Sequence, residues 1–301
     1  MKLRLGARGS QLSLAQAKLV TRSLQGRAEV ELIVIKTTGD RLSAAGSPIE
    51  WKGDFTRELD EALLDGRIDF AVHSMKDVPT QVPGELSLAA VPVREDPSDV
   101  LISRPRRSFA ELPAGARVGT ASPRRKAQLL AARPDLTILE ARGNVDTRLA
   151  RLAEGRFDGI VLARAGLSRL ARLEEASEVL PASVILPAIG QGALAIYARR
   201  DDRVTLSILE ALDDPASHRE AEAERSLLAA LEAGCKAPVA GLARVGNGSL
   251  TLSAGVFSPD GSSALREESS GPAAEAVSIG LAAGKRLLDR GAAAMIEAAG
   301  K

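Results

Sequence analysis

Apolar and polar positions follow two different periods along the first two thirds of the chain. Short apolar runs such as "VELIVIK" at 30–36 predict strands, and longer stretches with apolar residues every three or four positions predict helices. Ser10, Asp54 and Asn144 stand at the starts of three of these helical stretches, as N-caps do. Repeated strand-then-helix units predict parallel sheets with helices on both faces. The predicted strands are 3–7, 30–36, 68–74, 116–120, 136–141 and 158–163, and the predicted helices are 10–26, 54–66, 122–133 and 144–155.

Breaks in composition divide the chain into three parts. Two Pro- or Gly-bearing stretches, 93–99 and 186–193, bracket a middle segment and are typical of crossings between domains. A third break at 211–217 precedes the last part of the chain.

The last part follows a different pattern. A long helix is predicted over 217–234, and a final helix over 273–290. Between them, alternating runs are separated by turn signals at Gly246–Asn247–Gly248 and Pro259–Asp260–Gly261. This pattern predicts a small antiparallel sheet.

Composition limits the class of protein. Of the 301 residues, 45% are hydrophobic but only 2% are aromatic, so the cores must be aliphatic. No apolar run approaches the roughly 18 residues of a membrane span, and the start shows no signal-peptide pattern. One cysteine excludes an internal disulfide, and with two histidines a zinc site is not expected. We therefore expect a cytoplasmic protein without a metal or a membrane partner.

Positive charge is concentrated in the middle segment, although the whole chain carries a net charge of only +1. Residues 98–192 contain 15 Lys and Arg against 10 Asp and Glu, and most of these cations are Arg. Arg grips planar carboxylates and phosphates with two parallel hydrogen bonds. A solvated Arg-rich surface explains the charge count equally well.

Three predicted strand-to-helix turns combine Arg with a helix N-terminus. A helix N-terminus offers unpaired N–H groups and a positive dipole end, so an added Arg makes it an anion site. Three such turns at the carboxyl edge of parallel strands indicate a ligand with several oxyanions. None matches the P-loop pattern. The turns carry Arg8 and Ser10; Thr120, Ser122, Arg124 and Arg125; and Arg142 and Arg148.

The stretch "AVHSMKDVPT" (71–80) places Asp77 after another predicted strand. A carboxylate among cations stays ionised, and it can stabilise a developing positive charge or relay a proton. A turn aspartate bonded to its own backbone is the alternative. His73 and Ser74 are adjacent in a strand and point to opposite faces, so His73 is predicted to be a core residue.

The single cysteine, Cys235, lies in "LEAGCKAPVAG", a run rich in Gly, Lys and Pro after the long helix. A buried, inert cysteine is the simplest interpretation of a lone thiol. The loop-like context favours an exposed and reactive one instead.

These pieces together resemble the hydroxymethylbilane synthase, or porphobilinogen deaminase, family. The resemblance rests on "ARGSQLSLAQ", "KGDFTRELDEALL", "DFAVHSMKDVPT", "REDPSDV", "VGTASPRRKAQL", "RGNVDTRLARL", "LPAIGQGALAI" and "AGCKAPVAG", which span residues 6–241. It implies an α/β fold with two periplasmic-binding-protein-like lobes, whose mixed sheets are flanked by helices, and a small C-terminal α+β domain. The implied boundaries are 1–97 with 193–211, 98–192, and 215–301.

The resemblance also implies a chemistry. A transferase of this family joins four porphobilinogen molecules head to tail, releases ammonia at each addition and frees a linear tetrapyrrole, 1-hydroxymethylbilane, by hydrolysis. The chain grows on a dipyrromethane cofactor held by a thioether, here to Cys235. Each pyrrole carries an acetate and a propionate, which explains an Arg-lined site. No nucleic acid or obligate protein partner is expected, and a monomer is implied.

The resemblance assigns roles to residues at matching positions. Asp77 is the catalytic acid that holds the cation left when ammonia departs. The implied cofactor-binding residues besides Cys235 are Lys76, Thr120, Ser122, Arg124, Arg125 and Arg142. The implied substrate-binding residues are Arg8, Ser10, Lys52, Phe55, Arg148, Arg169 and Gln191.

The sequence departs from the family in two places. In "AAGSPIEWKGDF" only Lys52 and Phe55 match the family's pattern, and Ala121 replaces a serine before the Arg pair. Two other functions are weighed against the enzyme. A non-enzymatic anion sensor of the same fold would need neither Asp77 nor Cys235. Nucleic-acid binding by the basic segment would require strong salt dependence and stacking aromatics, which this chain lacks.

Overall fold

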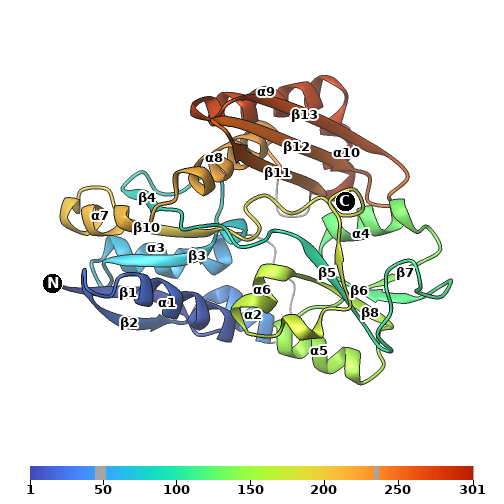
Figure 1. Ribbon diagram of the computed structural model, residues 1–301, viewed down its shortest axis with the longest axis horizontal. Helices are drawn as coiled ribbons and strands as arrows, with labels where there is room; N and C mark the ends of the chain where they lie inside the picture. Colours follow the sequence, from blue (N-terminus) through green and yellow to red (C-terminus); the bar gives the residue numbers. More distant parts are fainter. Residues whose placement is uncertain (45–51, 234–236, 301) are drawn as a thin grey trace.

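The computed structural model describes residues 1–44, 52–233 and 237–300. Their strands form three sheets, which lie in three separate bodies in Figure 1. Two five-stranded sheets lie side by side and are called the first and second lobe, and a three-stranded sheet above them belongs to the third domain. The mixed α/β fold class predicted from the sequence is confirmed.

The first lobe has the strand order β2-β1-β3-β10-β4. β1, β2 and β3 run parallel, whereas β10 is antiparallel to both of its neighbours. Apolar side chains of α1 cover one face of the sheet and those of α3 the other, as the strand-then-helix pattern predicts. The elements are β1 (Lys2–Arg8), α1 (Gln11–Ser23), β2 (Glu29–Ile35), α2 (Thr38–Ala44), η1 (Lys52–Phe55), α3 (Arg57–Leu64), β3 (Phe70–Ser74), η2 (Met75–Asp77), β4 (Leu86–Ala90) and β10 (Leu194–Arg199).

The second lobe repeats this topology with the order β7-β6-β8-β5-β9. β6, β7 and β8 run parallel, and β5 is antiparallel to both of its neighbours. Each position of the first sheet therefore has a counterpart, with β6 matching β1 and β5 matching β10. The elements are β5 (Asp99–Ser103), β6 (Arg117–Gly119), α4 (Pro123–Ala132), β7 (Thr137–Leu139), α5 (Val145–Ala153), β8 (Gly159–Ala163), α6 (Arg164–Arg169), η3 (Leu173–Glu175) and β9 (Glu178–Leu180).

The mixed sheets that the resemblance implies are confirmed, because β5 and β10 are antiparallel to their neighbours, whereas the strand-then-helix pattern indicated only the parallel strands. β5 and β10 are where the chain enters the second lobe and returns from it, and both are almost wholly buried. In the sequence a buried strand is a short apolar run, and such a run does not indicate whether the strand is parallel or antiparallel to its neighbours. The antiparallel pairing follows from the crossing, which brings each strand into its sheet from the other lobe.

The third domain packs two helices against one face of an antiparallel sheet. The predicted hairpin is confirmed, because β11 and β12 are joined by Asn247 and Gly248, with φ of 51° and 77°. The helix α10 was not predicted. The elements after β10 are α7 (Arg203–Leu209), η4 (Glu210–Leu212), α8 (Pro215–Ala230), β11 (Val239–Gly246), β12 (Ser249–Phe257), β13 (Ala264–Pro272), η5 (Ala273–Glu275), α9 (Ala276–Asp289) and α10 (Ala292–Gly300).

Two helix starts differ from the sequence prediction. The predicted helix 54–66 begins only at Arg57, and Asp54 lies in the preceding 3₁₀ turn rather than capping the helix. The predicted helix 217–234 begins earlier, at Pro215, because the Asp214 side chain accepts a hydrogen bond from the Ser217 N–H. Proline at the first helical position fits this start.

A buried carboxylate joins the third domain to both crossing segments. Glu224 on α8 is fully buried and accepts hydrogen bonds from Arg94 Nη1 at 2.7 Å and from the Gly190 N–H at 2.6 Å. It also accepts one from the Ala243 N–H on β11 at 2.8 Å. Arg94 precedes β5 and Gly190 precedes β10, so α8 is fixed where the chain passes between the lobes.

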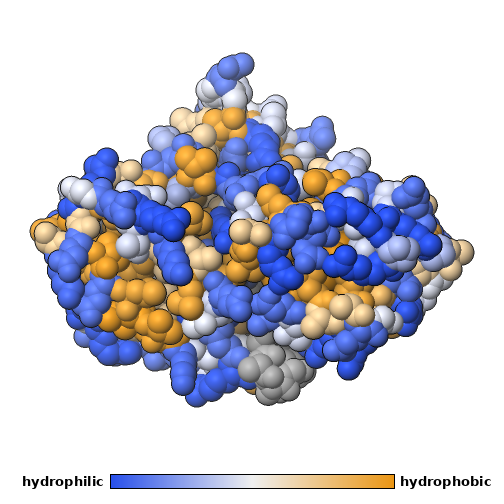
Figure 2. All heavy atoms as spheres, turned by 60° about the horizontal axis from the view of Figure 1, so that its bottom comes forward, coloured by the Kyte–Doolittle hydropathy of each residue, from blue (hydrophilic) through white to orange (hydrophobic). Residues whose placement is uncertain are grey.

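Surface hydropathy differs between the lobes. The first lobe exposes apolar side chains, among them Leu19, Leu32 and Val34. In the view of Figure 2, the broadest hydrophobic area lies on the first-lobe side of the molecule.

The third domain also rests on the second lobe through α4. Phe257 of β12 packs in one cluster with Ala127 of α4 and Leu186. The turn after β12 touches the helix so closely that a Cβ at Gly261 would lie 2.5 Å from the Ala127 carbonyl oxygen. The docking therefore depends on a glycine at this position.

We predict that Gly261→Ala will loosen the third domain from α4. Gly261 has φ of 76°, and the comparable glycine of the hairpin, Gly248, has φ of 77° with open space around it. Gly248→Ala should cost only the backbone strain, about 1–2 kcal/mol. Gly261→Ala should cost that strain plus the clash, about 1–3 kcal/mol more. Urea unfolding of both variants measures the difference, and equal losses would contradict the docking contact.

Candidate active site

The predicted helix N-caps Ser10 and Asn144 are confirmed, and Ser122 caps α4 in the same way. The side chains of Ser10, Ser122 and Asn144 accept hydrogen bonds from the backbone N–H groups of Ser13, Arg125 and Thr147, respectively. The caps hold the turns after β1, β6 and β7. Because these strands are parallel to their neighbours within each lobe, the turns lie at the carboxyl edges of the two sheets, where α/β folds bind ligands.

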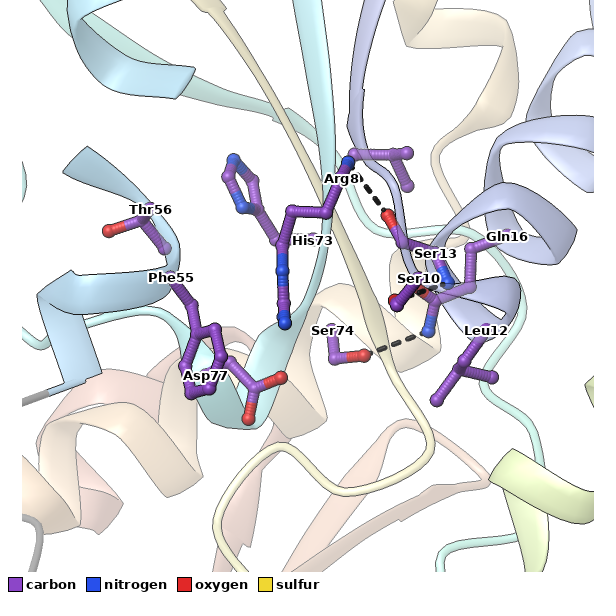
Figure 3. A pocket seen from close by; sticks show the side chains of 11 residues that line it. Arg8, Ser10, Leu12, Ser13, Gln16, Phe55, Thr56, His73, Ser74 and Asp77 are labelled. Atoms are coloured by element: carbon purple, nitrogen blue, oxygen red, sulfur yellow. Dashed lines mark hydrogen bonds between the residues drawn. The ribbon is translucent and has the colours of Figure 1, made fainter. Parts of the chain in front are cut away.

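A small pocket opens at this edge in the first lobe (Figure 3). Arg8, Ser10, Phe55, Ser74 and Asp77 are among its lining residues, so it unites two of the predicted motifs. The cavity volume is about 40 Å³, enough to hold water-sized groups. In Figure 3 the Arg8 side chain points toward the Asp77 carboxylate.

Arg8 is held on two sides. Its Nε donates to Asp40 Oδ1 at 3.1 Å, and its guanidinium carbon lies 4.0 Å from the centre of the Phe55 ring. The Arg8 guanidinium is the main group that holds the pKa of Asp40 below its usual range, against the opposing effect of burial. Phe55 thus lines the pocket next to Arg8, whereas Asp40 was not predicted.

In the second lobe, a single buried carboxylate holds two arginines. Asp99, the first residue of β5, lies 2.8 Å from Arg124 Nη2 and 2.6 Å from Arg125 Nη2. All three side chains are nearly or fully buried. The two guanidinium groups hold the pKa of Asp99 far below its usual range although burial alone would raise it. Two cations on one anion leave excess positive charge in a dry environment, which favours an anionic ligand.

Lys76 and Gln191 connect this cluster to the first lobe. Gln191 Nε2 donates to Asp99 Oδ1 at 2.9 Å, and its Oε1 accepts from Lys76 Nζ at 3.5 Å. Burial lowers the pKa of Lys76 to about 8, an effect that the neighbouring Asp77 carboxylate opposes. Asp77, Lys76 and the Arg124–Arg125 pair therefore occupy one electrostatic environment.

Two polar residues shape the turn before α4. Thr120 is buried, and its Oγ1 accepts from the Ser122 N–H at 3.1 Å. The Ser122 Oγ in turn accepts from the Arg125 N–H at 3.4 Å. In this structure both hydroxyls therefore set the local conformation that presents Arg124 and Arg125.

The third turn adds further arginines. Arg148 on α5 donates from Nε to the Gly143 carbonyl at 2.8 Å. Burial lowers its pKa to about 10, and repulsion from Arg125, Arg142 and Arg151 adds to this effect. Arg142 is more exposed and lies 2.6 Å from Glu140. A cluster of like charges at this spacing is stabilised when an anion binds.

Arg169 lies on α6 and contacts a crossing segment. Its Nη2 donates to the Gly192 carbonyl at 2.6 Å, and burial lowers its pKa to about 10, partly opposed by Glu95. Gly192 has φ of 87°, and a Cβ there would meet the Glu95 carbonyl. Arg169 therefore joins the second lobe to the point where the chain returns to the first.

His73 is a core residue, as predicted. It is 5% exposed, its ring packs edge-on to Tyr197, and burial lowers its pKa to about 4. In Figure 3 the imidazole points away from Asp77. His73 is therefore a neutral neighbour of the site.

Two predicted residues cannot be placed. Cys235 lies outside the described residues, and so does the side chain of Lys52, whose backbone belongs to η1. Ala121 leaves only Thr120 and Ser122 as hydroxyls in the turn before α4.

Sequence reasoning missed Asp40 and Asp99. The sequence places both residues at positions that could have been noticed. Asp99 is a charged residue at the start of an apolar run, and Asp40 follows a predicted strand. A charged residue at the beginning of a buried strand was the available signal, because such a residue needs a partner.

Comparison with known proteins identifies the family of the chain. Residues 3–207 match the family model described as porphobilinogen deaminase, dipyromethane cofactor binding domain, and residues 218–289 match the model of the C-terminal domain. The chain belongs to the porphobilinogen deaminase family. The family predicted from the sequence is thus confirmed, and with it the transferase class and the dipyrromethane cofactor.

Curated relatives agree over nearly the full length. The porphobilinogen deaminase of Rubrobacter xylanophilus is 51% identical over 98% of this chain and 96% of its own length. That of Desulforudis audaxviator is 49% identical over 95% and 94%. Among solved structures, a putative methionine-binding lipoprotein from Bacillus subtilis aligns with a TM-score of 0.45 at 13% identity over 71% of this chain and 90% of that chain, which is too low to support an argument.

The residues of the site fit a dipyrromethane, which carries several carboxylates. Arg124 Nε is buried without a hydrogen-bond partner among the described residues, and Arg148 is repelled by Arg125, Arg142 and Arg151. In the described residues no group of three His, Cys, Asp or Glu side chains is arranged to hold a metal ion.

We predict that Asp99→Asn will destabilise the protein by about 3–5 kcal/mol, because it leaves two buried cations without their counter-charge. The loss should be full above pH about 4 and shrink as the pH falls through the depressed pKa of Asp99, where the wild-type carboxylate is also protonated. The midpoint of urea unfolding at several pH values measures this.

Asp158→Asn in the same lobe is the control. Asp158 pairs with Arg117 at 2.9 Å, but both side chains are about a third exposed or more. Its loss should cost about 0–1 kcal/mol. A loss for Asp99→Asn no larger than for this variant would show that Asp99 does not hold the arginines.

Proposed function

We propose that this chain condenses four porphobilinogen molecules head to tail, with loss of ammonia at each step, on a dipyrromethane held by Cys235. Hydrolysis then releases 1-hydroxymethylbilane. One observation carries the proposal: Asp77 and Lys76 share one turn, at which Arg8 of the first lobe and Arg124 and Arg125 of the second converge. An acid beside several cations is what this chemistry requires, since each substrate brings two carboxylates and becomes a cation on losing ammonia.

The cations of the site would bind carboxylates. Lys76, Arg124, Arg125 and Arg142, with Thr120 and Ser122, would hold those of the dipyrromethane. Arg8, Ser10, Arg148, Arg169, Gln191, Lys52 and Phe55 would bind the substrate and the growing chain. Arg and buried Lys bind carboxylates most strongly where water is excluded, as around Asp99.

Asp77 would act on the reacting end of the substrate. Its carboxylate would stabilise the cation formed when ammonia leaves and would transfer protons at the pyrrole N–H and the amine. When bound, the dipyrromethane supplies the nucleophilic pyrrole carbon. Arg8, whose side chain points to Asp77, would position the carboxylate of the substrate next to it.

The domain division is part of the proposal. We propose that 1–97 with 193–211 form one domain, 98–192 the second, and 215–301 the third. The sheets support this division, because β10 joins the first sheet and β5 the second. We also propose a cytoplasmic monomer that needs no protein partner and binds neither nucleic acid nor membrane. In the described residues no helix is long and apolar enough to cross a membrane.

We predict that the purified active protein will exceed its polypeptide mass by two linked pyrrole units. The increment should be absent from Cys235→Ser, which has no thiol for the thioether. Intact-protein mass spectrometry measures both, and circular dichroism confirms that the variant is folded. Active protein with the bare polypeptide mass would refute the tether.

We predict that kcat/KM for porphobilinogen will fall as the pH rises through about 8. This is the lowered pKa of Lys76, above which the neutral amine no longer attracts a carboxylate. Lys76→Arg keeps its charge and should shift the alkaline limb to higher pH. Lys126→Arg on the exposed face of α4 is the control and should leave the profile unchanged. An alkaline limb that stays in place in Lys76→Arg would exclude Lys76 as its origin.

A further inference from the structure

A carboxylate of the chain itself already holds the arginine of the first lobe. Asp40 Oδ1 accepts from Arg8 Nε at 3.1 Å and from Arg8 Nη2, and Oδ2 accepts from Nε at 3.2 Å. The contact is therefore side-on, along the Nε–Nη2 edge of the guanidinium. Nη1 is not used by Asp40 and has no partner among the described residues.

The side-on contact fixes where the rest of the guanidinium points. The centre of the Phe55 ring lies 4.0 Å from the central carbon of the Arg8 guanidinium. Phe55 therefore covers one face of the guanidinium, and Asp40 occupies one edge. The guanidinium end of the side chain is directed toward Asp77 (Figure 3). A guanidinium with five donors can bind a second carboxylate there while it keeps the first.

Asp40 is itself anchored. The Thr37 hydroxyl, which is fully buried, donates to Asp40 Oδ2 at 2.8 Å and accepts from the Asp40 N–H at 3.2 Å. One residue further on from Thr37, the Thr38 N–H donates to Glu58 Oε1 of α3 at 2.8 Å. The carboxylate of Asp40 is thus tied to the end of β2 and, through α2, to α3.

We propose, resting on the function proposed above, that Asp40 is a positioning residue that orients Arg8 to receive a carboxylate of porphobilinogen beside Asp77. Asp40 does not touch the substrate and acts only through Arg8. Without Asp40, the long Arg8 side chain would sample several rotamers. Substrate binding would then be weaker, because it would have to order this side chain at a cost in conformational entropy.

The chain provides a matched control for a merely structural ion pair. At the other end of β1, Arg4 is held by Asp69 through the same Nε and Nη2 edge, at 3.1 and 2.7 Å. The Asp69 carboxylate also accepts from the Arg4 N–H at 2.7 Å, and neither residue lines the pocket. Loss of either aspartate removes a comparable ion pair, but only Asp40 lies at the site.

The experiment compares Asp40→Asn, Asp40→Glu and Asp69→Asn in the holoenzyme, with porphobilinogen as the probe. We expect Asp40→Asn to raise KM about tenfold with kcat within about twofold, because Arg8 binds the carboxylate equally in the ground and transition states. Asp40→Glu should recover most of this loss. Asp69→Asn should lower stability as much as Asp40→Asn but leave KM unchanged.

A double-mutant cycle with Arg8→Lys tests whether Asp40 acts through Arg8. We expect Asp40→Asn to add less than about twofold to the effect of Arg8→Lys, since the group that Asp40 orients has already gone. If Asp40→Asn leaves KM unchanged, or if its full effect persists in the Arg8→Lys background, the positioning role is wrong. Turnover of porphobilinogen by the wild type in the same assay keeps this result separate from the proposed function, which fails only if the wild type is inactive.

Discussion

The site depends on one buried ion cluster in which Asp99 neutralises Arg124 and Arg125. Guanidinium groups as deeply buried as these are retained in a fold only with a counter-charge, because desolvation of an unpaired cation costs several kcal/mol. Asp99 supplies one negative charge for two arginines, and Lys76 adds a third cation close by. The fold thus keeps an excess of positive charge in a dry place, and a ligand rich in carboxylates completes the balance.

The position of Asp99 on a crossing strand makes this cluster a feature of both lobes. Gln191, on the returning segment, bonds Asp99 and reaches Lys76 of the first lobe. Arg94 and Gly190, on the two crossing segments, bond Glu224 of the third domain. The same short stretches that connect the domains therefore also align their charged groups. A change of angle between the lobes would alter the distance between Arg8 and the Arg124–Arg125 pair. The geometry of the site therefore depends on the arrangement of the domains.

The features that could be predicted from the sequence are those that depend on contacts between residues close together in the chain. Ser10, Ser122 and Asn144 cap helices by accepting hydrogen bonds from N–H groups three residues away, so these caps can be recognised in the sequence. The direction of β5 and β10 and the partners of Asp99 depend on contacts between distant segments, such as Arg125 at a separation of 26 residues. Family resemblance implied roles for residues at matching positions, but not for Asp40 and Asp99, which contact Arg8 and the Arg124–Arg125 pair, respectively. The helix start at Arg57 was missed because a 3₁₀ turn takes up the stretch that contains Asp54, the predicted cap.

The two lobes fix their arginines in different ways, and the difference suits different ligands. Asp99 is fully buried, so exchange of its partners would expose unpaired charge at low dielectric, and the Arg124–Arg125 arrangement is rigid. Asp40 and Arg8 are each about a fifth exposed, so water screens the pair and its rearrangement costs far less. The rigid Arg124–Arg125 pair is suited to a cofactor that stays bound through every cycle. A partly exposed arginine beside the acid is suited to a substrate whose carboxylates must bind and then move on with each addition.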